Sequence, residues 1–213
     1  MFTLEDIERA LSDVLLSTED SIRPLLKPSR SVGGIFALPR EVSCYIDFLG
    51  ALYSGWDGKN KKEIATSKKA ITFIKEIFGE IDLNYRIYGE LFYRVVRHGT
   101  VHHFSPYKIE RDDGATLEWL IYGGRRKSCF GNYAGKECIV NHLEPFTFNR
   151  SNKKRDIFPV SLDCLYEDLR KAIELYLDKI KKEVREDKRE LLEKYVSVMQ
   201  VLMKSNKVKD LTW

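Results

Sequence analysis

The sequence predicts a mainly α-helical protein with a small β-rich insertion ahead of a long C-terminal helix. Apolar residues recur at helical spacing through most of the chain, whereas residues 107–148 combine β-forming residues with glycine turns. The chain has 213 residues, of which 43% are hydrophobic, so a real core can be buried. This length favours a single domain over residues 1–213 that includes the insertion.

The first helix is predicted to start at Thr3, which can cap the first turn together with Asp6. A break rich in proline, serine and glycine follows at residues 27–34. The expected inward face of this helix consists of Leu4, Ile7, Leu11, Val14 and Leu15.

Three more helices are expected before the insertion. The second begins after Pro39, and the third runs from Ile64 to Phe78 and stops at Gly79. The fourth begins near Asp82 or Asn84. Its inward face is predicted to contain Leu83, Ile87, Leu91, Phe92 and Val95.

The insertion at 107–148 is expected to form a small antiparallel sheet or hairpin, with strands at 116–122 and 138–148. The polar residues 149–156 indicate a loop. The last helical region starts near Ser161 or Asp163. The charged run 183–193 either continues it as a solvated helix or separates two helices.

The overall charge is close to balanced, with a formal net charge of +4, and gives no strong argument for nucleic acid. A weakly basic protein can still bind RNA through one local patch. The four cysteines contain no C-x-x-C pair and are expected to be free thiols. The acidic N-terminus lacks a signal-peptide pattern, and no apolar run approaches the roughly 20 residues that span a bilayer. A cytoplasmic protein without a membrane partner is therefore expected.

The most unusual local composition lies at residues 94–103, where three of the four histidines follow two arginines. Histidine exchanges protons near neutral pH, and arginine grips phosphate oxygens. RNA supplies its own 2′-hydroxyl nucleophile, so these two residue types suffice for cleavage without a metal. Arg97 and His102 are separated by roughly 140° on an ideal helix. A bend at Gly99 or a second subunit is therefore expected to complete the site.

Residues 97–102 resemble the signature of the HEPN superfamily, which is an arginine, often a polar residue, and a histidine after four to six intervening positions. His98 matches the polar position, and Phe104 matches an aromatic residue found in many members. The longer stretch 93–106 is similar to an uncharacterised bacterial HEPN-like group.

The resemblance implies a HEPN-like helical bundle, a homodimer, and an active cleft where two signatures meet. Many catalytic members are metal-independent endoribonucleases in toxin, phage-defence or CRISPR-associated systems. The resemblance thus implies catalytic roles for Arg97 and His102, with His98, Arg94 and His103 in supporting positions. The β-rich insertion is not part of the common bundle.

Other interpretations of the same residues remain open. Arg97 and His102 can instead form a structural hydrogen-bond network at a helix end. His98 and His102 have the spacing of helical metal ligands, but no companion carboxylate or cysteine stands at a telling distance. No metal and no cofactor are therefore expected.

Two basic clusters, at 125–127 and 153–155, are either solvated loops or contacts to an RNA backbone. The candidate RNA-binding residues are Arg125, Arg126 and Lys127. Two function classes follow. One is an endoribonuclease, as a toxin or phage-defence effector with an antitoxin or regulatory partner. The other is a non-catalytic HEPN-like module for RNA binding or dimerisation.

Overall fold

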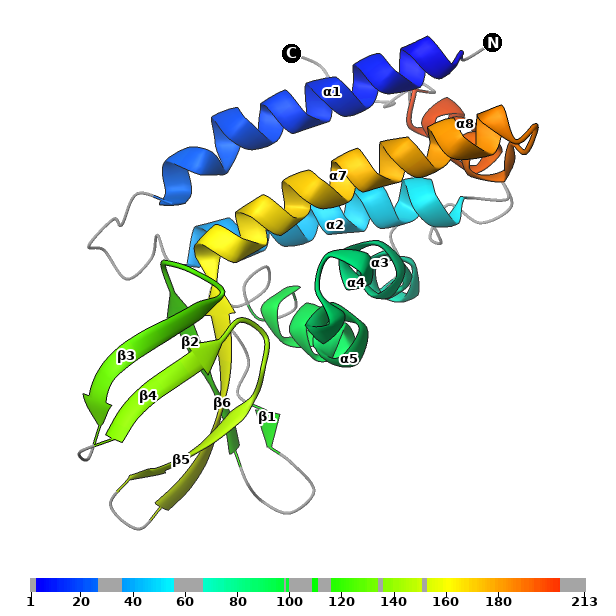
Figure 1. The fold of residues 1–213 in the computed structure, drawn as a ribbon. Coiled ribbons are helices and arrows are strands. Elements are labelled where there is room, and N and C mark those ends of the chain that lie inside the picture. Colours follow the sequence, from blue (N-terminus) through cyan, green and yellow to red (C-terminus); the bar gives the residue numbers. More distant parts are fainter. Residues whose placement is uncertain are drawn as a thin grey trace, which may run out of the picture.

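Helices make up most of the structure, a computed structural model that describes residues 3–26, 36–55, 67–97, 99, 109–110, 116–133, 136–150 and 153–203. The predicted mainly α fold is confirmed. Figure 1 shows α1, α2 and α7 side by side, with the strands below one end of them. The helical elements are α1 (Leu4–Ser21), η1 (Arg23–Leu26), α2 (Ala37–Ser54), α3 (Ser67–Phe73), η4 (Ile74–Phe78), α4 (Gly79–Ile81), α5 (Leu83–Phe92), η5 (Tyr93–Arg97), α7 (Leu162–Arg185) and α8 (Glu190–Leu202).

The first helix begins as predicted. The Thr3 hydroxyl accepts a hydrogen bond from the backbone N–H of Asp6, and the Asp6 carboxylate accepts one from the Thr3 N–H. This capping box satisfies two backbone donors that the first turn leaves unpaired. Ile7 and Leu11 are fully buried beneath it, and α1 packs against α7.

Two helix boundaries differ from the prediction. α2 begins at Ala37, so Pro39 lies inside its first turn. Backbone N–H groups in the first turn of a helix make no hydrogen bond within the helix, so proline, which lacks this group, is tolerated there. The third helix does not stop at Gly79, because the chain continues through the π-helical η4 into α4 and ends at Ile81. Gly79 has ordinary helical dihedral angles and a close contact with the side chain of Arg86. Its missing Cβ therefore serves close packing and not chain termination.

The fourth helix begins at the first of its two predicted starts, Asp82, whose carboxylate accepts a hydrogen bond from the Asn84 N–H. Its predicted inward face is partly wrong, because Leu83 and Ile87 are 61% and 58% exposed. The buried face instead contains Tyr85, Gly89, Phe92, Tyr93, Val95 and Val96. The bulky tyrosines take the inward positions because both of their hydroxyls find hydrogen-bond partners there.

The strands extend further along the chain than predicted. A four-stranded sheet has the order β1-β2-β6-β5, and β3 pairs with β4 in a separate hairpin. β5 and β6 occupy most of the segment 149–156 that was expected to be a loop, and β6 runs on to the start of α7. The strands are β1 (Ile109–Glu110), β2 (Thr116–Tyr122), β3 (Lys127–Tyr133), β4 (Lys136–Asn141), β5 (Phe146–Arg150) and β6 (Lys153–Ser161).

The expected all-antiparallel arrangement is also wrong at the centre of the sheet. β2 and β6 are parallel, with Leu117 opposite Asp156 and Tyr122 opposite Ser161. β1 and β5 are antiparallel to their neighbours at the two edges. A parallel pair needs a long connection, and β3, β4 and β5 lie within it.

The long helix after the sheet starts where the sequence predicts, with Ser161 as its cap. The Ser161 hydroxyl accepts a hydrogen bond from the Cys164 N–H. α7 ends at Arg185 and α8 begins at Glu190, so the charged run separates two helices. Asp187 has a φ of 57° in the turn between them, a left-handed conformation that aspartate tolerates better than most residues.

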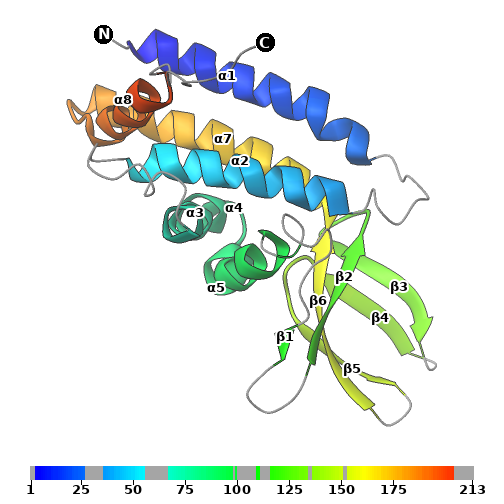
Figure 2. The same cartoon turned by 180° about the vertical axis from the view of Figure 1, so that it is seen from behind.

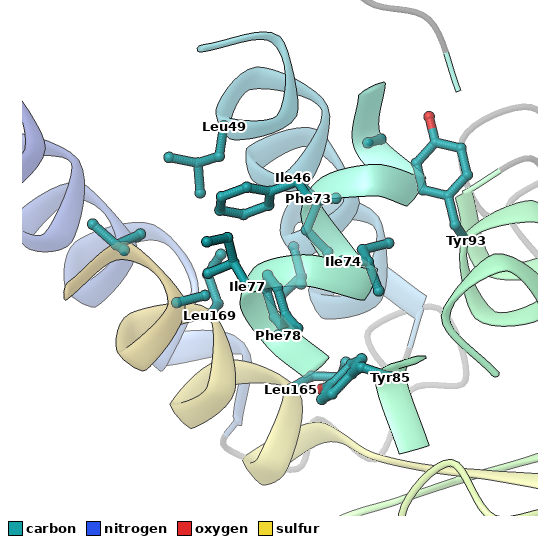
Figure 3. Packing of buried hydrophobic residues seen from close by; sticks show 14 of the residues in the cluster. Ile46, Leu49, Phe73, Ile74, Ile77, Phe78, Tyr85, Tyr93, Leu165 and Leu169 are labelled. Carbon is teal, nitrogen blue, oxygen red and sulfur yellow. The ribbon is translucent and has the colours of Figure 1, made fainter. Parts of the chain in front are cut away.

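The core lies where α3 and η4 pack against α2 and α7. Figure 3 shows Phe73 and Ile77 facing Ile46 and Leu49 of α2, with Leu169 of α7 nearby. Phe73 makes edge-to-face contacts with Phe78 and Tyr176, at ring-centroid distances of 5.8 and 5.9 Å. All the side chains named here are fully buried, so they hold the helical layers together.

Candidate functional site

Arg97 is the last residue of η5, the π-helical turn that continues α5. Its Nε donates a hydrogen bond to the Asp47 carboxylate on α2 at 3.1 Å. The side chains of Arg97 and Asp47 are 24% and 14% exposed, so the ion pair is partly shielded from water. π-Helical turns inside α-helices frequently occur at functional sites. The structure therefore fixes one edge of this guanidinium while leaving part of the side chain accessible.

Asp47 also accepts a hydrogen bond from the Tyr93 hydroxyl, one helical turn before Arg97. Burial and this hydrogen bond raise the pKa of Tyr93, so its hydroxyl stays protonated and donating. Partial burial opposes the charge of Arg97, but Asp47 outweighs it and the pKa of Arg97 is raised. Asp47, which also accepts a hydrogen bond from Tyr93, therefore holds the cationic side chain of Arg97 in place between α2 and the end of η5. Such a cation can stabilise negative charge on a phosphorane.

Arg94 occupies a different environment from Arg97. Its side chain is 64% exposed and pairs with Glu90 one turn earlier, at 2.9 Å. Glu90 is in turn paired with Lys75 of η4 at 3.2 Å. The structure thus does not bring the two arginines to one carboxylate, and Arg94 lies on the outer surface of η5.

The histidine part of the predicted site cannot be placed. His98, His102 and His103 lie outside the described residues. Gly99, which was expected to interrupt the helix, is itself helical and buried. The irregular backbone lies just before it, in η5, and not at the glycine itself.

The cluster at 125–127 divides into two exposed residues and one paired residue. Arg125 and Lys127 are exposed at the start of the β3–β4 hairpin. Arg126 instead points to the helices, where its Nη2 donates to both carboxylate oxygens of Asp168 at 2.7 Å. Its Nη1 donates to the Asp82 carboxylate. The guanidinium of Arg126 is therefore engaged by two carboxylates, and an RNA-binding role for it stays a prediction.

Behind Arg126 lies a buried hydrogen-bond chain that the sequence analysis did not identify. The Tyr85 hydroxyl donates to Asp168 at 3.0 Å and lies 3.0 Å from Nε2 of His142. Nδ1 of His142 accepts from the Ser161 backbone N–H at 3.0 Å. Neutral His142 therefore carries its proton on Nε2 and donates it to the tyrosine oxygen. The chain links α5 and α7 to the end of the sheet.

Burial, followed by the nearby charge of Arg126, lowers the pKa of His142 to about 3. Burial also raises the pKa of the Asp168 carboxyl, against the opposing effect of its pair with Arg126. His142 and Asp168 are both fully buried, so a substrate cannot reach either side chain. This cluster, called the junction network below, holds the strands against the helices. Its members are Asp82, Tyr85, Arg126, His142, Ser161 and Asp168.

One signal in the sequence could have revealed part of the junction network. Asp168 follows Leu165 by three residues and precedes Leu169, so it falls on the apolar face of α7. An acidic residue on such a face needs a buried cation or donor. Nothing in the sequence indicates that Arg126, 42 positions earlier, supplies it.

A pocket of about 600 Å³ lies between α2, α3, α7 and α8, and none of the predicted site residues lines it. Its four lysines and four glutamates balance, so its charge does not favour an anion such as RNA. Within the described part of the chain, no group of three histidine, cysteine or acidic side chains is arranged to hold a metal ion. The charged lining residues are Glu76, Lys179, Lys182, Glu183, Glu186, Lys188, Glu190 and Lys194.

Comparisons with models of protein families, with curated proteins and with solved structures find no match for this chain. Among the described residues, no helix has the length and apolar character needed to cross a membrane. The chemical interpretation of the site therefore depends on its own residues.

Proposed function

We propose that the protein is a metal-independent endoribonuclease that cleaves RNA through attack of the substrate's own 2′-hydroxyl. Arg97 stabilises negative charge on the phosphorane, and His102 transfers the proton. His98, Arg94 and His103 support these two residues. In the cell, the protein acts as a toxin or phage-defence effector in the cytoplasm, and an antitoxin or other regulatory partner controls it.

The observation that supports this proposal most is the placement of Arg97. Asp47 holds Nε of the guanidinium at 3.1 Å, and the side chain is only partly shielded. It stands at the end of η5, directly before the histidine-rich segment. A guanidinium oriented in advance loses little freedom when a phosphate arrives, and its planar fork suits phosphate oxygens.

The active form in this proposal is a homodimer with a HEPN-like arrangement, in which residues 97–104 of two copies approach a two-fold axis. One copy supplies a single positioned arginine, whereas two copies can bracket a phosphate from both sides. Measurement of mass by light scattering at micromolar concentration tests this, and a strictly monomeric protein that still cleaves RNA would refute the dimeric site.

The alternative is a non-catalytic HEPN-like module for RNA binding or dimerisation. The ion pair between Arg97 and Asp47 also supports this alternative. Tyr93, Asp47 and Arg97 tie η5 to α2, so the arginine has a structural task that needs no substrate. In that case its replacement should lower stability while no RNA is cleaved by the wild-type protein.

The test is incubation of purified protein with mixed RNA in EDTA, beside His102→Ala and Arg97→Ala. Loss of proton transfer should slow cleavage about 10²- to 10⁴-fold in His102→Ala. Loss of charge stabilisation should slow it on the order of 10²-fold or more in Arg97→Ala. Arg97→Lys should rescue little, because a point charge does not reproduce the planar fork.

The matched control is Arg185→Ala, which removes an exposed arginine from the last turn of α7 and should cleave normally. The products should carry 2′,3′-cyclic phosphate or 3′-phosphate ends, and DNA and 2′-O-methyl RNA should resist. Activity abolished by EDTA, or products with 3′-hydroxyl ends, would refute the proposal in favour of a metal nuclease. Absence of cleavage by the wild-type protein would favour the binding module.

A further inference from the structure

The pocket between α2, α3, α7 and α8 is separate from the surroundings of Arg97 and from the junction network, because none of those residues lines it. Its volume of about 600 Å³ falls within the range of small-molecule sites. Figures 1 and 2 both show α8 at the end of the helical layer that lies away from the strands. The pocket is therefore a second concave site, and its chemistry can be considered apart from RNA.

Charged side chains of both signs line this pocket. Four lysines and four glutamates contribute to it, and Leu191 is the one aliphatic side chain among its described lining residues. An apolar ligand would take these charges out of water without pairing them, which is unfavourable. A ligand of a single sign would meet as many repelling charges as attracting ones. The lining therefore suits a molecule that carries both a positive and a negative group.

Two carboxylates of the pocket are held in position by hydrogen bonds. Glu76 accepts one from the Tyr53 hydroxyl, and Glu183 accepts one from the Leu191 N–H at 2.9 Å. Burial, the hydrogen bond to Glu76 and the charges of three nearby glutamates raise the pKa of Tyr53. Its hydroxyl therefore stays protonated and lies among carboxylates. This side of the pocket attracts an ammonium group, and carboxylates that are oriented in advance lose little freedom when it binds.

A buried hydroxyl on the same side also indicates a polar occupant. Tyr176 precedes Lys179 by three residues and Glu183 by seven, so it shares the face of α7 that lines the pocket. Its ring centroid lies 5.7 Å from that of Tyr53. The Tyr176 hydroxyl is fully buried and has no hydrogen-bond partner among the described residues, which is uncommon in a folded protein. A phenol oxygen can accept a hydrogen bond from an ammonium group.

The lysines of the pocket differ in how closely carboxylates hold them. Three of them each have a carboxylate oxygen within 3.0 Å of the ammonium nitrogen. Lys182 lies 4.0 Å from Glu186, beyond hydrogen-bond distance, and its side chain is 76% exposed. Because Glu186 already binds Lys188 at 3.0 Å, Lys182 is the cation most easily drawn to a negative group of a ligand. It directly precedes Glu183, so both kinds of contact come from one stretch of α7.

We infer that this pocket binds a small zwitterion of the amino-acid class, which carries one ammonium and one carboxylate group. The ammonium group binds between Glu76 and Glu183, and the carboxylate binds Lys182. The occupant links α7 and α8 to α2 and η4, so its binding stabilises this end of the helical layer. The pocket binds this molecule and does not transform it.

The test is isothermal titration calorimetry of the full chain with γ-aminobutyrate and ε-aminocaproate, two zwitterions that differ in the separation of their charges. For each zwitterion, the matched probes are the fatty acid and the alkylamine that lack one of its charged groups. At least one zwitterion should bind at millimolar concentration. Its fatty acid should bind on the order of ten-fold more weakly or worse, because two carboxylates lose their partner. Its alkylamine should bind about three-fold more weakly or worse, because water screens the exposed lysine.

Two variants assign each group of the ligand to its residue. Glu76→Gln keeps an acceptor for the Tyr53 hydroxyl but removes the negative charge, and Lys182→Gln removes the exposed cation. Each variant should bind the zwitterion about three-fold more weakly or worse. In Glu76→Gln the advantage of the zwitterion over the fatty acid should shrink, whereas in Lys182→Gln its advantage over the alkylamine should shrink.

The matched controls are Glu174→Gln and Lys171→Gln, which remove exposed charges of α7 outside the pocket. Both should bind every probe as wild type does, and circular dichroism should show that all four variants fold. Equal affinities in wild type and all variants, or no binding of either zwitterion, would overturn the inference. A fatty acid or an alkylamine that binds as tightly as its zwitterion would also overturn it, in favour of a site for a single charge. No RNA enters this titration, so its outcome does not depend on the proposed nuclease.

Discussion

Acidification from pH 7 to pH 5 is expected to weaken the fold through His142, the buried histidine of the junction network. Its pKa in the folded protein is about 3, against an ordinary value of 6.5 in the unfolded chain. A group whose folded pKa is depressed contributes stability above its unfolded pKa, and that stability is lost as pH falls toward the folded pKa. The sensitive window for His142 therefore opens near pH 6.5 and extends downward.

The magnitude follows from the free energy of protonating the unfolded histidine, which is RT ln(1 + 10^(6.5 − pH)). This quantity rises from about 0.2 kcal/mol at pH 7 to about 2 kcal/mol at pH 5, while the folded histidine binds almost no proton. His142 alone should thus lower the free energy of unfolding by about 2 kcal/mol over this range. Burial of the side chain is complete, so no screening by water reduces the effect.

The groups around His142 affect the pH dependence in opposite directions. Arg126 keeps its charge throughout, and the raised pKa of Tyr85 keeps its hydroxyl protonated. The raised pKa of Asp168 has the opposite effect on stability. Acidification stabilises the fold through this group, because the folded carboxyl binds its proton more readily than the unfolded one. A measurement on wild type alone would therefore mix the two titrations.

Comparison with His142→Asn isolates the histidine. The asparagine carbonyl oxygen can still accept the Ser161 N–H, but the side chain does not titrate, and Asp168 remains in place. Urea unfolding followed by circular dichroism at pH 7, 6 and 5 gives the free energy of unfolding of both proteins. Wild type should lose about 2 kcal/mol more than the variant between pH 7 and pH 5. Parallel curves for the two proteins would refute the neutral, buried assignment of His142.

Two further predictions concern the packing of the helices and strands. Arg126→Ala leaves the fully buried carboxylate of Asp168 without its cation and should cost about 2 kcal/mol or more. The lower bound is modest because the side chain of Arg126 is itself 37% exposed, so water screens part of its interaction with Asp168. Arg125→Ala, next to it, should stay within about 0.5 kcal/mol of wild type in the same urea titration. Phe92→Ala should cost about 3–5 kcal/mol, whereas Ile87→Ala on the exposed face of α5 should cost less than about 1 kcal/mol. Similar losses in these last two variants would contradict the assignment of the buried face.

Local signals predicted the helix starts well. Thr3, Asp82 and Ser161 each cap a helix, because a short polar side chain bonds a backbone N–H two or three residues away. The buried face of α5 was harder to predict. Leu83 and Ile87 are more apolar than Tyr85, but the tyrosine is buried because Asp168 and His142 pair with its hydroxyl. Partners that come from distant segments are invisible to periodicity.

The same limitation explains the missed strand and the missed network. Residues 149–156 show no apolar alternation, so the hydrophobic pattern gave no sign of the strands β5 and β6 in this segment. Arg126 looked like a member of an exposed basic cluster, but its carboxylate partners lie 44 positions before it and 42 positions after it. Arg97 was identified from its sequence context, whereas its partner Asp47 was not, because that carboxylate lies on another helix.

The parallel pairing of β2 with β6 has a consequence for the time course of folding. Leu117 meets Asp156 only after roughly 40 further residues have been added, which takes about 2–8 seconds at ordinary rates of synthesis. During this interval β2 can pair only with the short β1 at its other edge. Contacts between residues so far apart in the sequence form slowly, because closing the long loop costs conformational entropy before strand pairing stabilises it. α1 to α5 precede β2 in the chain and α7 and α8 follow β6, so the sheet can close only after the first helices have emerged, just before the two C-terminal helices are made.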